Sequence, residues 1–260
     1  EVKDGKKTLA EAEKEMKARA RDEKRAEVVA ARMQTDAPLD DKNRLYVGDM
    51  LDILPTLGRF DLVLADPPYN VTPWAWDKIG NREDFLRQTK KWFDAIVPHL
   101  KDEYCIFWFC SPSYCADIEM IIRELGLDIK SRIIWHRRNM AKGSDAKFKF
   151  VDTWEMIFHV GNRVLNFPDQ WDDSRFDVQT FAVPQTNFID EKLHPTQKPL
   201  ALISWLVSFG SFPGDDILDP FAGSGTTGEA SGGRKCTLIE RDVQYAKVIC
   251  NRLRIEAQNG

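Results

Sequence analysis

The feature that most constrains the fold is an alternation, from Arg44 onward, of short apolar runs with longer amphipathic stretches. Such alternation is typical of an α/β fold, in which helices connect the strands of a mostly parallel sheet. The run YCIFWFC is apolar throughout, as expected for a strand that is covered on both faces. Seven strands are predicted, over residues 44–47, 61–65, 104–110, 129–135, 153–160, 215–219 and 236–240.

The stretches between these runs predict the connecting helices. Ser111 and Pro112 suit the N-cap and the first position of a helix that ends near Gly126. Together with the strands, the helices predict one α/β domain over residues 41–260. Further helices are predicted over residues 83–99, 199–210, 225–231 and 242–256.

Residues 1–40 differ from the rest of the chain. They are rich in Ala, Glu, Lys and Arg, which favour helix, and Thr8 with Glu11 fits a capping box. The apolar stripe is thin and mostly alanine, so the sequence predicts a helical N-terminal extension that is exposed or bound to a partner. Through this helix the protein would form a homodimer or bind another protein.

The composition, 43% hydrophobic and 30% charged, is typical of a globular protein. No run approaches the roughly 18 apolar residues of a membrane span. No signal peptide is visible, although the sequence begins at Glu1 rather than Met, and a cytoplasmic protein is expected. The five cysteines form no CxxC pair, so neither a metal site nor a disulfide framework is expected.

The net charge of −4 does not by itself indicate nucleic-acid binding, so the distribution of charge matters more. Residues 130–149 contain seven basic side chains against one acid, Asp145. On charge alone, a solvated loop is the alternative to a phosphate-binding segment. The basic residues are Lys130, Arg132, Arg137, Arg138, Lys142, Lys147 and Lys149.

The stretch DILDPFAGSGTT is a strand, an acid and a glycine-rich turn that leads into a helix. Such turns let a ligand approach the backbone at the carboxyl end of a strand. A phosphate-binding P-loop is excluded because no Gly-Lys-Ser/Thr follows, while residues 223–228 match GxGxxG literally. Glu240 ends the next strand, where a carboxylate can bind ribose hydroxyls. NAD and S-adenosylmethionine both carry that ribose, and an exposed strand-end acid is a further alternative.

Three motifs together resemble one family. DPPY at 66–69, DPFAGSGTT at 219–227 and HPTQKP at 194–199 resemble the amino-group DNA methyltransferases of the β arrangement, in which the target-base motif precedes the cofactor motif. The resemblance covers roughly residues 44–257. It implies a Rossmann-like class I methyltransferase fold, S-adenosylmethionine as cofactor and DNA, most simply double-stranded, as partner.

The resemblance gives the DPPY stretch a chemical role. Asp66 and the carbonyl of Pro67 would accept hydrogen bonds from the exocyclic amine of the target base. Because proline fixes φ and lacks an N–H, Pro67 and Pro68 would hold that carbonyl in one direction. Tyr69 would stack on a base flipped out of the duplex. Methylation at cytosine C5 is excluded because the chain has no Pro-Cys pair.

The resemblance also implies a cofactor pocket. Glu240 would bind the ribose, Lys198 would meet the cofactor carboxylate, and Asp219 would orient the glycine-rich turn. A core or capping role suits Asp49 and His194 equally well. The implied cofactor-binding residues are Phe221, Gly223, Ser224, Gly225 and Thr226 around the methionine part, Asp49 and Met50 near the adenine, and His194, Thr196 and Lys198 along the wall.

The base and its sequence context are less constrained. If the sheet forms as predicted, residues 130–149 would lie on the same rim as Asp66 and bind DNA phosphates. Residues 161–193 lie where the family places target recognition. Asp at the first position of DPPY goes mainly with adenine N6 in this arrangement, so adenine is expected. The alternatives are cytosine N4 methylation and a non-catalytic partner subunit.

Overall fold

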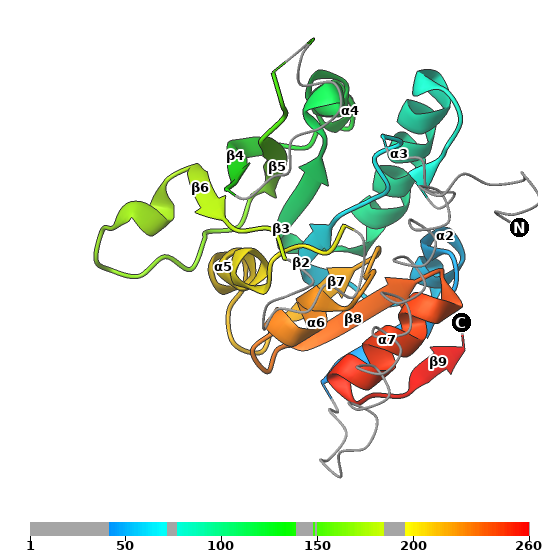
Figure 1. Ribbon diagram of the computed structural model, residues 1–260. Helices are drawn as coiled ribbons and strands as arrows, with labels where there is room; N and C mark the ends of the chain where they lie inside the picture. Colours follow the sequence, from blue (N-terminus) through cyan, green and yellow to red (C-terminus); the bar gives the residue numbers. More distant parts are fainter. Residues whose placement is uncertain (1–41, 72–76, 139–147, 149, 185–195, 260) are drawn as a thin grey trace, which may run out of the picture. The chain divides into compact units, whose positions relative to one another are not determined.

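The computed structural model describes residues 42–71, 77–138, 148, 150–184 and 196–259. Within these ranges one nine-stranded sheet has the order β6-β4-β5-β3-β2-β7-β8-β1-β9 (Figure 1). The extension expected over residues 1–40 lies outside the described residues, so it stays a prediction. The strands are β1 (Asn43–Val47), β2 (Phe60–Ala65), β3 (Leu100–Cys110), β4 (Ile129–Arg137), β5 (Trp154–Gly161), β6 (Val178–Phe181), β7 (Asp216–Asp219), β8 (Lys235–Glu240) and β9 (Ala257–Asn259).

Most neighbouring strands run parallel, and β5 is the exception. It pairs antiparallel with both β3 and β4, while β2 pairs parallel with β3 and β7, and β8 pairs parallel with β7 and β1. The carboxyl ends of β2, β3, β7 and β8 therefore meet at one edge of the sheet. This edge is where the motifs of the sequence come together.

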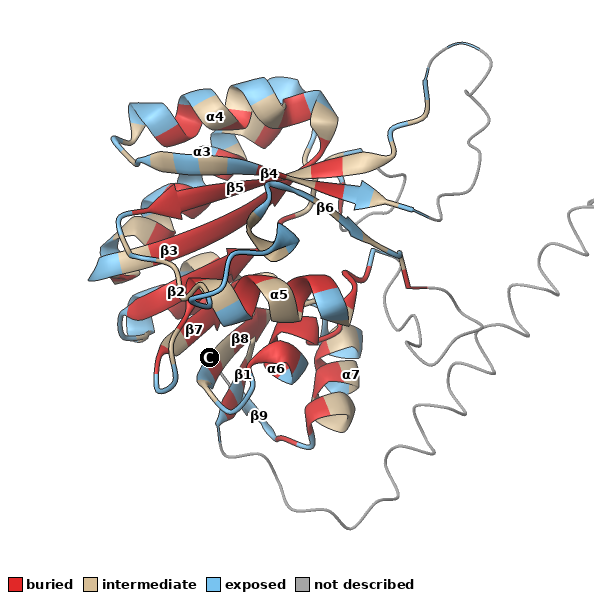
Figure 2. Ribbon diagram, turned by 90° about the vertical axis from the view of Figure 1, so that its left-hand side faces the viewer, coloured by how far each residue is buried: buried red, intermediate tan, exposed pale blue. Residues whose placement is uncertain are grey.

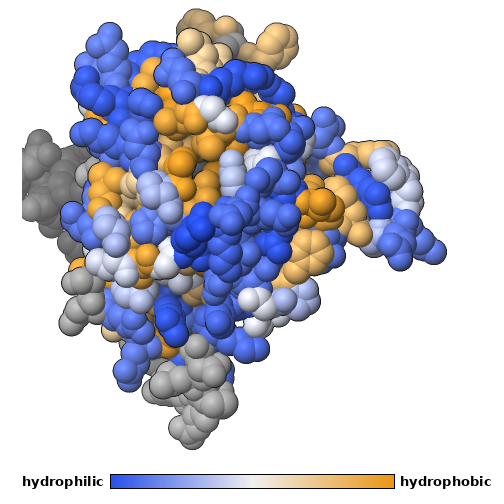
Figure 3. Space-filling model, turned by 180° about the vertical axis from the view of Figure 1, so that it is seen from behind, coloured by the Kyte–Doolittle hydropathy of each residue, from blue (hydrophilic) through white to orange (hydrophobic). Residues whose placement is uncertain are grey.

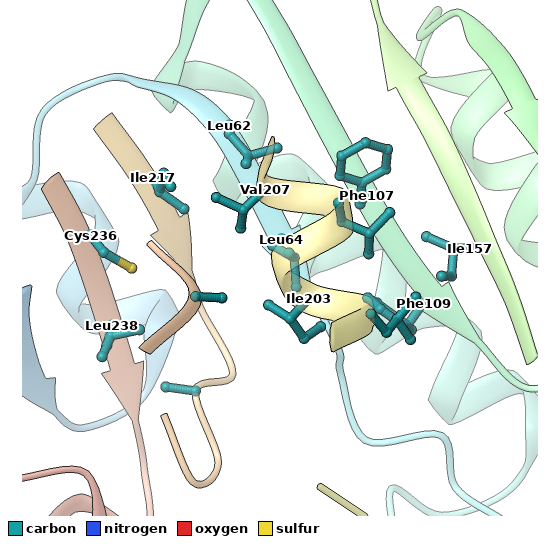
Figure 4. Close-up of a cluster of buried hydrophobic side chains, with 14 of the residues drawn as sticks. Leu62, Leu64, Phe107, Phe109, Ile157, Ile203, Val207, Ile217, Cys236 and Leu238 are labelled. Atoms are coloured by element: carbon teal, nitrogen blue, oxygen red, sulfur yellow. The ribbon is translucent and has the colours of Figure 1, made fainter. Parts of the chain in front are cut away.

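Helices cover both faces of the sheet, and their apolar sides form two core clusters. The cluster on one face includes Ile203 and Val207 of α5, which lie beside Leu64 and Leu62 of β2 (Figure 4). The central strands are almost entirely buried between the two layers (Figure 2). One layer is α5 (Leu200–Gly210), α6 (Thr226–Ala230) and α7 (Val243–Leu253); the other is α2 (Met50–Ile53), α3 (Arg82–Ile96) and α4 (Cys115–Glu124). None of the helices described is long and apolar enough to cross a membrane.

All seven predicted strands are confirmed, but the predicted strand count of seven was wrong. The two further strands, β6 and β9, are short and lie at the edges of the sheet, where pairing with one neighbour rather than an apolar run defines them. The helix predicted over 83–99 ends at Ile96, and a separate 3-10 turn, Val97–His99, follows it. The helix predicted over 242–256 ends at Leu253 because Arg254 adopts a left-handed conformation, with φ 55°.

The end of α5 approaches the sheet so closely that only glycine fits there. A Cβ on Gly210 would lie 2.5 Å from the Phe107 ring and 3.1 Å from Leu62, both in the buried core. Replacing Gly210 with alanine would therefore force α5 away from β3, because a well-packed core has no space for another methyl group.

We predict that Gly210→Ala lowers the free energy of unfolding by about 1–3 kcal/mol, the usual range for overpacking. Urea unfolding followed by circular dichroism measures the change. Gly58→Ala is the matched control, since a Cβ on this exposed glycine meets nothing within 4 Å. Equal stability of the two variants would contradict the close approach of α5.

Candidate active site

Three carboxylates meet where the parallel strands end. Asp66 follows β2, while Asp219 and Glu240 are the last residues of β7 and β8. A cavity of about 840 Å³ opens at this edge, and all three residues line it. Ligands of open α/β sheets bind at such an edge, and the volume is typical of a site for a small organic molecule.

One oxygen of Asp66 belongs to a ring of four polar atoms. Asp66 Oδ1 lies 2.7 Å from Tyr69 Oη and 2.8 Å from Lys198 Nζ. Glu155 Oε2 lies 3.2 Å from the same hydroxyl and from the same ammonium. Because a phenol has one proton, Tyr69 donates to the nearer oxygen, that of Asp66, whereas the ammonium has protons for both carboxylates. The ring joins the end of β2 to β5 and to the segment before α5.

The charges of this ring are balanced by Arg137, whose Nη1 lies 3.2 Å from Glu155 Oε1. Two carboxylates thus face two cations. Burial raises the pKa of Asp66, and Lys198 opposes that rise while Glu155 adds to it. Burial also lowers the pKa of Lys198, but Asp66 and Glu155 outweigh that effect and raise it overall. The ammonium therefore stays protonated and holds Asp66 in place.

The carboxylate of Asp77 holds the backbone of the DPPY loop. Its Oδ1 accepts from the N–H groups of Tyr69 at 2.6 Å and Asn70 at 3.0 Å, and its Oδ2 accepts from Val71 at 2.9 Å. The Asp77 side chain is buried, so these bonds are shielded from water. Asn70 takes a left-handed conformation, with φ 57°, and its side chain accepts from Ile79 N at 3.0 Å. The Tyr69 side chain is thus fixed at its backbone by Asp77 and at its hydroxyl by Asp66.

The glycine-rich turn is shaped by two left-handed glycines, Gly223 at φ 53° and Gly225 at φ 77°. Asp219 orients the turn, as expected, because it accepts from Phe221 N at 3.0 Å and from Thr227 Oγ1 at 2.5 Å. Burial raises the pKa of Asp219 to about 7. Gly225 supports the turn from behind, since a Cβ there would lie 3.1 Å from Ile249.

Glu240 lies beside this turn and is bound to it. Its Oε2 accepts from Gly223 N at 2.7 Å, and its Oε1 accepts from Asp242 N at 2.7 Å. Burial raises the pKa of Glu240 to about 7, while the two backbone donors oppose the rise. The alternative of an exposed strand-end acid is therefore wrong: Glu240 is a cavity residue.

Most residues predicted for the site line this one cavity. Asp49 does so as the N-cap of α2, where its carboxylate accepts from Leu51 N at 3.0 Å. His194 lies outside the described residues. The ammonium of Lys198 is paired with Asp66 and Glu155, and its expected contact with the cofactor carboxylate stays a prediction. The predicted residues that line the cavity are Asp49, Met50, Asp66, Pro67, Pro68, Tyr69, Thr196, Lys198, Asp219, Phe221, Gly223, Ser224, Thr226 and Glu240.

The basic segment is divided by the strand that contains it. The pairs Ile129 with Val160 and His136 with Trp154 show that β4 runs in the same direction as β3, so that its last residues lie at the Asp66 edge. Through β5 and β3, Arg132 is level with Ala65, the last residue of β2. The expected contact of Lys130 and Arg132 with DNA phosphates stays a prediction.

Lys130 and Arg132 both have acidic partners. Lys130 Nζ lies 2.5 Å from Asp128, and Arg132 Nε lies 2.8 Å from Glu119. At the carboxyl end of β4, Arg137 lines the cavity, and Arg138, just after the strand, is exposed. Lys142, Lys147 and Lys149 lie outside the described residues.

Three functional residues were missed by sequence reasoning. Glu155 interrupts the apolar run TWEMIFHV, and an acid in a strand covered on both faces signals a buried partner. Asp77 carries no such signal, because its role depends on how the loop folds back. Arg252 supports the glycine-rich turn: its Nη1 donates to Ser224 O at 3.0 Å and lies 3.2 Å from Thr226 Oγ1.

Comparison with known proteins agrees with this arrangement. The type II methyltransferase M2.DpnII of Streptococcus pneumoniae is 28% identical over 226 residues, covering 76% of this chain and 83% of the relative. The DNA adenine methyltransferase YhdJ of Escherichia coli K12 is 29% identical over 233 residues, covering 74% of this chain and 76% of the relative.

Solved structures show the same fold. The M1.HpyAVI–SAM complex has a TM-score of 0.66 at 25% identity, covering 82% of this chain and 100% of that one. The cytosine-N4-specific PvuII DNA methyltransferase has a TM-score of 0.70 at 15% identity, covering 82% and 87%, and speaks for the fold alone. The family model described as DNA methylase matches residues 60–251. The chain therefore belongs to the DNA methylase family.

Proposed function

We propose that this DNA methylase transfers the methyl group of S-adenosylmethionine to N6 of adenine in DNA. The observation that carries the proposal is the position of Asp66. Its carboxylate stands at the end of β2, beside the cavity that also contains the glycine-rich turn and Glu240. An amine acceptor and a cofactor pocket thus share one wall of the same cavity.

The residues at the cofactor end fit S-adenosylmethionine. Each oxygen of Glu240 accepts one backbone N–H and keeps a further lone pair, which a ribose hydroxyl can use. The left-handed turn at Gly223 exposes backbone to the cavity without a side chain in the way. When bound, this cofactor supplies a methyl group activated by a positively charged sulfur. Asp49 and Met50, which also line the cavity, would contact its adenine.

At the other end, Asp66 and Pro67 would grip the amine of the base. Among the residues that the structure describes, the partners of Asp66 contact only its Oδ1, so Oδ2 is available as an acceptor. An exocyclic amine is a poor nucleophile because its lone pair is delocalised into the ring. Two acceptors, Asp66 Oδ2 and the Pro67 carbonyl, would draw its N–H bonds out of the plane and stabilise the positive charge that develops on nitrogen.

Tyr69 would hold the ring of the base. Lys198 Nζ lies 5.0 Å from the centroid of the tyrosine ring and so occupies one of its faces. The other face would stack on the flipped base, a contact that contributes about 1–3 kcal/mol per base. The hydroxyl that bonds to Asp66 keeps the ring beside the amine acceptor.

Adenine is favoured over cytosine on two grounds. The chain has Asp in the first position of DPPY, and its relative YhdJ is named a DNA adenine methyltransferase. The likeness to the cytosine-N4-specific PvuII enzyme rests on 15% identity and does not bear on the base.

The product identifies the base directly. Duplex DNA of mixed sequence is incubated with the full chain and methyl-labelled S-adenosylmethionine, digested to nucleosides and separated by chromatography. We expect N6-methyl-2′-deoxyadenosine as the labelled product. If N4-methylcytosine is the sole labelled product, the target base is cytosine and not adenine. If no DNA yields a labelled nucleoside, the chain is better explained as a non-catalytic partner subunit.

Target recognition would come from the segment after β5, within the expected region 161–193. It projects beside the sheet, on the left in Figure 1 and on the right in Figure 3, where hydrophobic and hydrophilic atoms lie side by side. Trp171 is 73% exposed, and the Arg175 guanidinium lies 4.9 Å from its ring centroid. An exposed aromatic beside a cation is suited to bases and phosphates.

Two wider expectations remain part of the proposal. The composition of residues 1–40 favours a helix that joins two copies or binds a partner protein. The relatives come from bacteria, whose DNA lies in the cytoplasm, and we place the activity of this chain there.

We predict that Asp66→Ala lowers kcat by about 100-fold or more, because it removes an acceptor that acts where charge develops. Binding of S-adenosylmethionine, measured by calorimetry, should stay within about twofold, since Glu240 and the turn are untouched. Asp94→Ala on the exposed face of α3 is the control. Full activity of Asp66→Ala would remove Asp66 from the mechanism.

We predict that Asp77→Asn lowers kcat by about tenfold or more, because an amide cannot accept from three backbone N–H groups and the loop loses its direction. The free energy of unfolding should fall by about 1–3 kcal/mol, the effect of weakened hydrogen bonds to a buried charged group. Asp94→Asn provides the exposed control for both measurements. An unchanged kcat at reduced stability would limit Asp77 to a structural role.

A further inference from the structure

We propose that Glu155 is a positioning residue for methyl transfer, which acts through Lys198 and Tyr69 to turn Asp66 Oδ2 toward the amine of the base. The proposal rests on the proposed function, because it concerns the orientation of the acceptor in that reaction. Glu155 itself would not touch the reacting atoms.

The ring geometry gives Glu155 this influence. Lys198 Nζ is held between two carboxylate oxygens, at 2.8 Å from Asp66 and 3.2 Å from Glu155. Tyr69 Oη lies between the same two oxygens, at 2.7 Å and 3.2 Å. Both donors of Asp66 Oδ1 therefore have their second contact on Glu155. With Oδ1 fixed at two points, rotation of the carboxylate is blocked and Oδ2 keeps one direction.

The surroundings leave Lys198 little choice of partner. Its side chain is 6% exposed, and its Nζ lies 5.3 Å from the ring centroid of Phe109 and 5.9 Å from that of Trp135. Aromatic rings attract a cation but cannot replace the water that a buried ammonium loses. The carboxylates of Asp66 and Glu155 take the place of that water. If Glu155 became neutral, the ammonium would shift toward Asp66 as its single anionic partner.

Glu155 is itself fixed from the opposite side. It lies on β5, paired in register with Trp135 of β4, and its Oε1 faces Arg137 Nη1 at 3.2 Å. Arg137 also donates to the carbonyl of Asp152, so the guanidinium is anchored to backbone. The position of Glu155 is thus set by β4 and β5. Through Lys198 and Tyr69, Glu155 in turn fixes the position of Asp66.

The charged groups around Asp66 determine how its pKa changes when Glu155 is replaced. Lys198 and the Tyr69 hydroxyl lower the pKa of Asp66, whereas burial and the charge of Glu155 raise it. Asp219 of β7 adds a further carboxylate at this edge, Cys110 of β3 lies near Tyr69, and Arg137 faces Glu155. The acceptor role requires Asp66 to be ionised. Removing the Glu155 charge therefore lowers the pKa of Asp66, and the acid limb of the pH profile moves to lower pH.

The test is Glu155→Gln in the full chain, with methyl transfer to duplex DNA measured from pH 5 to 9. We expect kcat to fall about 10- to 100-fold, as for misplaced reacting groups. The KM for S-adenosylmethionine should stay within about twofold. The acid limb should move to lower pH, because the negative charge of Glu155, which raises the pKa of Asp66, is gone. A structural role alone would lower the melting temperature and leave the acid limb in place, and that result would overturn the proposal.

A second variant separates position from charge and serves if the glutamine variant does not fold. Glu155→Asp keeps the charge but withdraws the carboxylate by one methylene, so kcat should fall about tenfold while the acid limb stays within a few tenths of a pH unit. Wild-type kcat in this variant would overturn the proposal.

Two further measurements fix the interpretation. Glu103→Gln, an exposed strand glutamate, is the matched control and should behave as wild type. Tyr69→Phe removes a hydrogen bond that lowers the pKa of Asp66, so its acid limb should move to higher pH, opposite to Glu155→Gln. If the wild-type chain transfers no methyl group, the proposed function fails; if it does and Glu155→Gln matches it, the role of Glu155 alone fails.

Discussion

The buried ammonium of Lys198, shared between Asp66 and Glu155, is the interaction on which the catalytic end of the cavity depends. Removing an ammonium from water costs several kcal/mol, which only well-placed partners offset. Here the partners come from the end of β2 and from β5, and the lysine from the segment before α5. Three distant parts of the chain must therefore meet before the charge is satisfied, and their meeting fixes the position of Asp66, the proposed amine acceptor.

The sheet order explains why two halves of one reaction can share a cavity. β2 carries Asp66 at its end and lies directly beside β7, with Val63 paired to Leu218. The glycine-rich turn follows β7, and Glu240 ends the next strand, β8. Motifs that are far apart in sequence thus become neighbours because their strands are parallel and adjacent. A buried strand gives each motif a rigid base, since its side chains are fixed on both faces.

Much of this could be predicted from the sequence, because it is encoded locally. A strand such as YCIFWFC is apolar over its whole length, and the glycines of the turn mark a left-handed backbone. Residues of the DPPY and FAGSGTT motifs, which the resemblance assigns to one site, line one cavity. β6 and β9 were missed because an edge strand of three or four residues is defined by its neighbour, not by an apolar pattern.

The partners of charged side chains could not be predicted in the same way. Lys198 was expected to meet a cofactor carboxylate, but its nearest acceptors are two carboxylates of the chain itself. Asp77 lies in a loop, and nothing in its local sequence indicates that it binds three consecutive backbone N–H groups. Such contacts depend on which segments the fold brings together, and a motif specifies the residue but not its neighbour.

The basic segment shows the same limit for charge. A count along the sequence treats seven cations between residues 130 and 149 as one patch. Yet β4 extends through the first of them, and a strand rises about 3.3 Å per residue, so Lys130 and Arg137 are separated by most of the height of the sheet. Over such a distance, salt screens one charge from the other. The proposed electrostatic attraction of DNA to the cavity therefore depends on the cations at the carboxyl end of β4, and Lys130, already paired with Asp128, adds little to it.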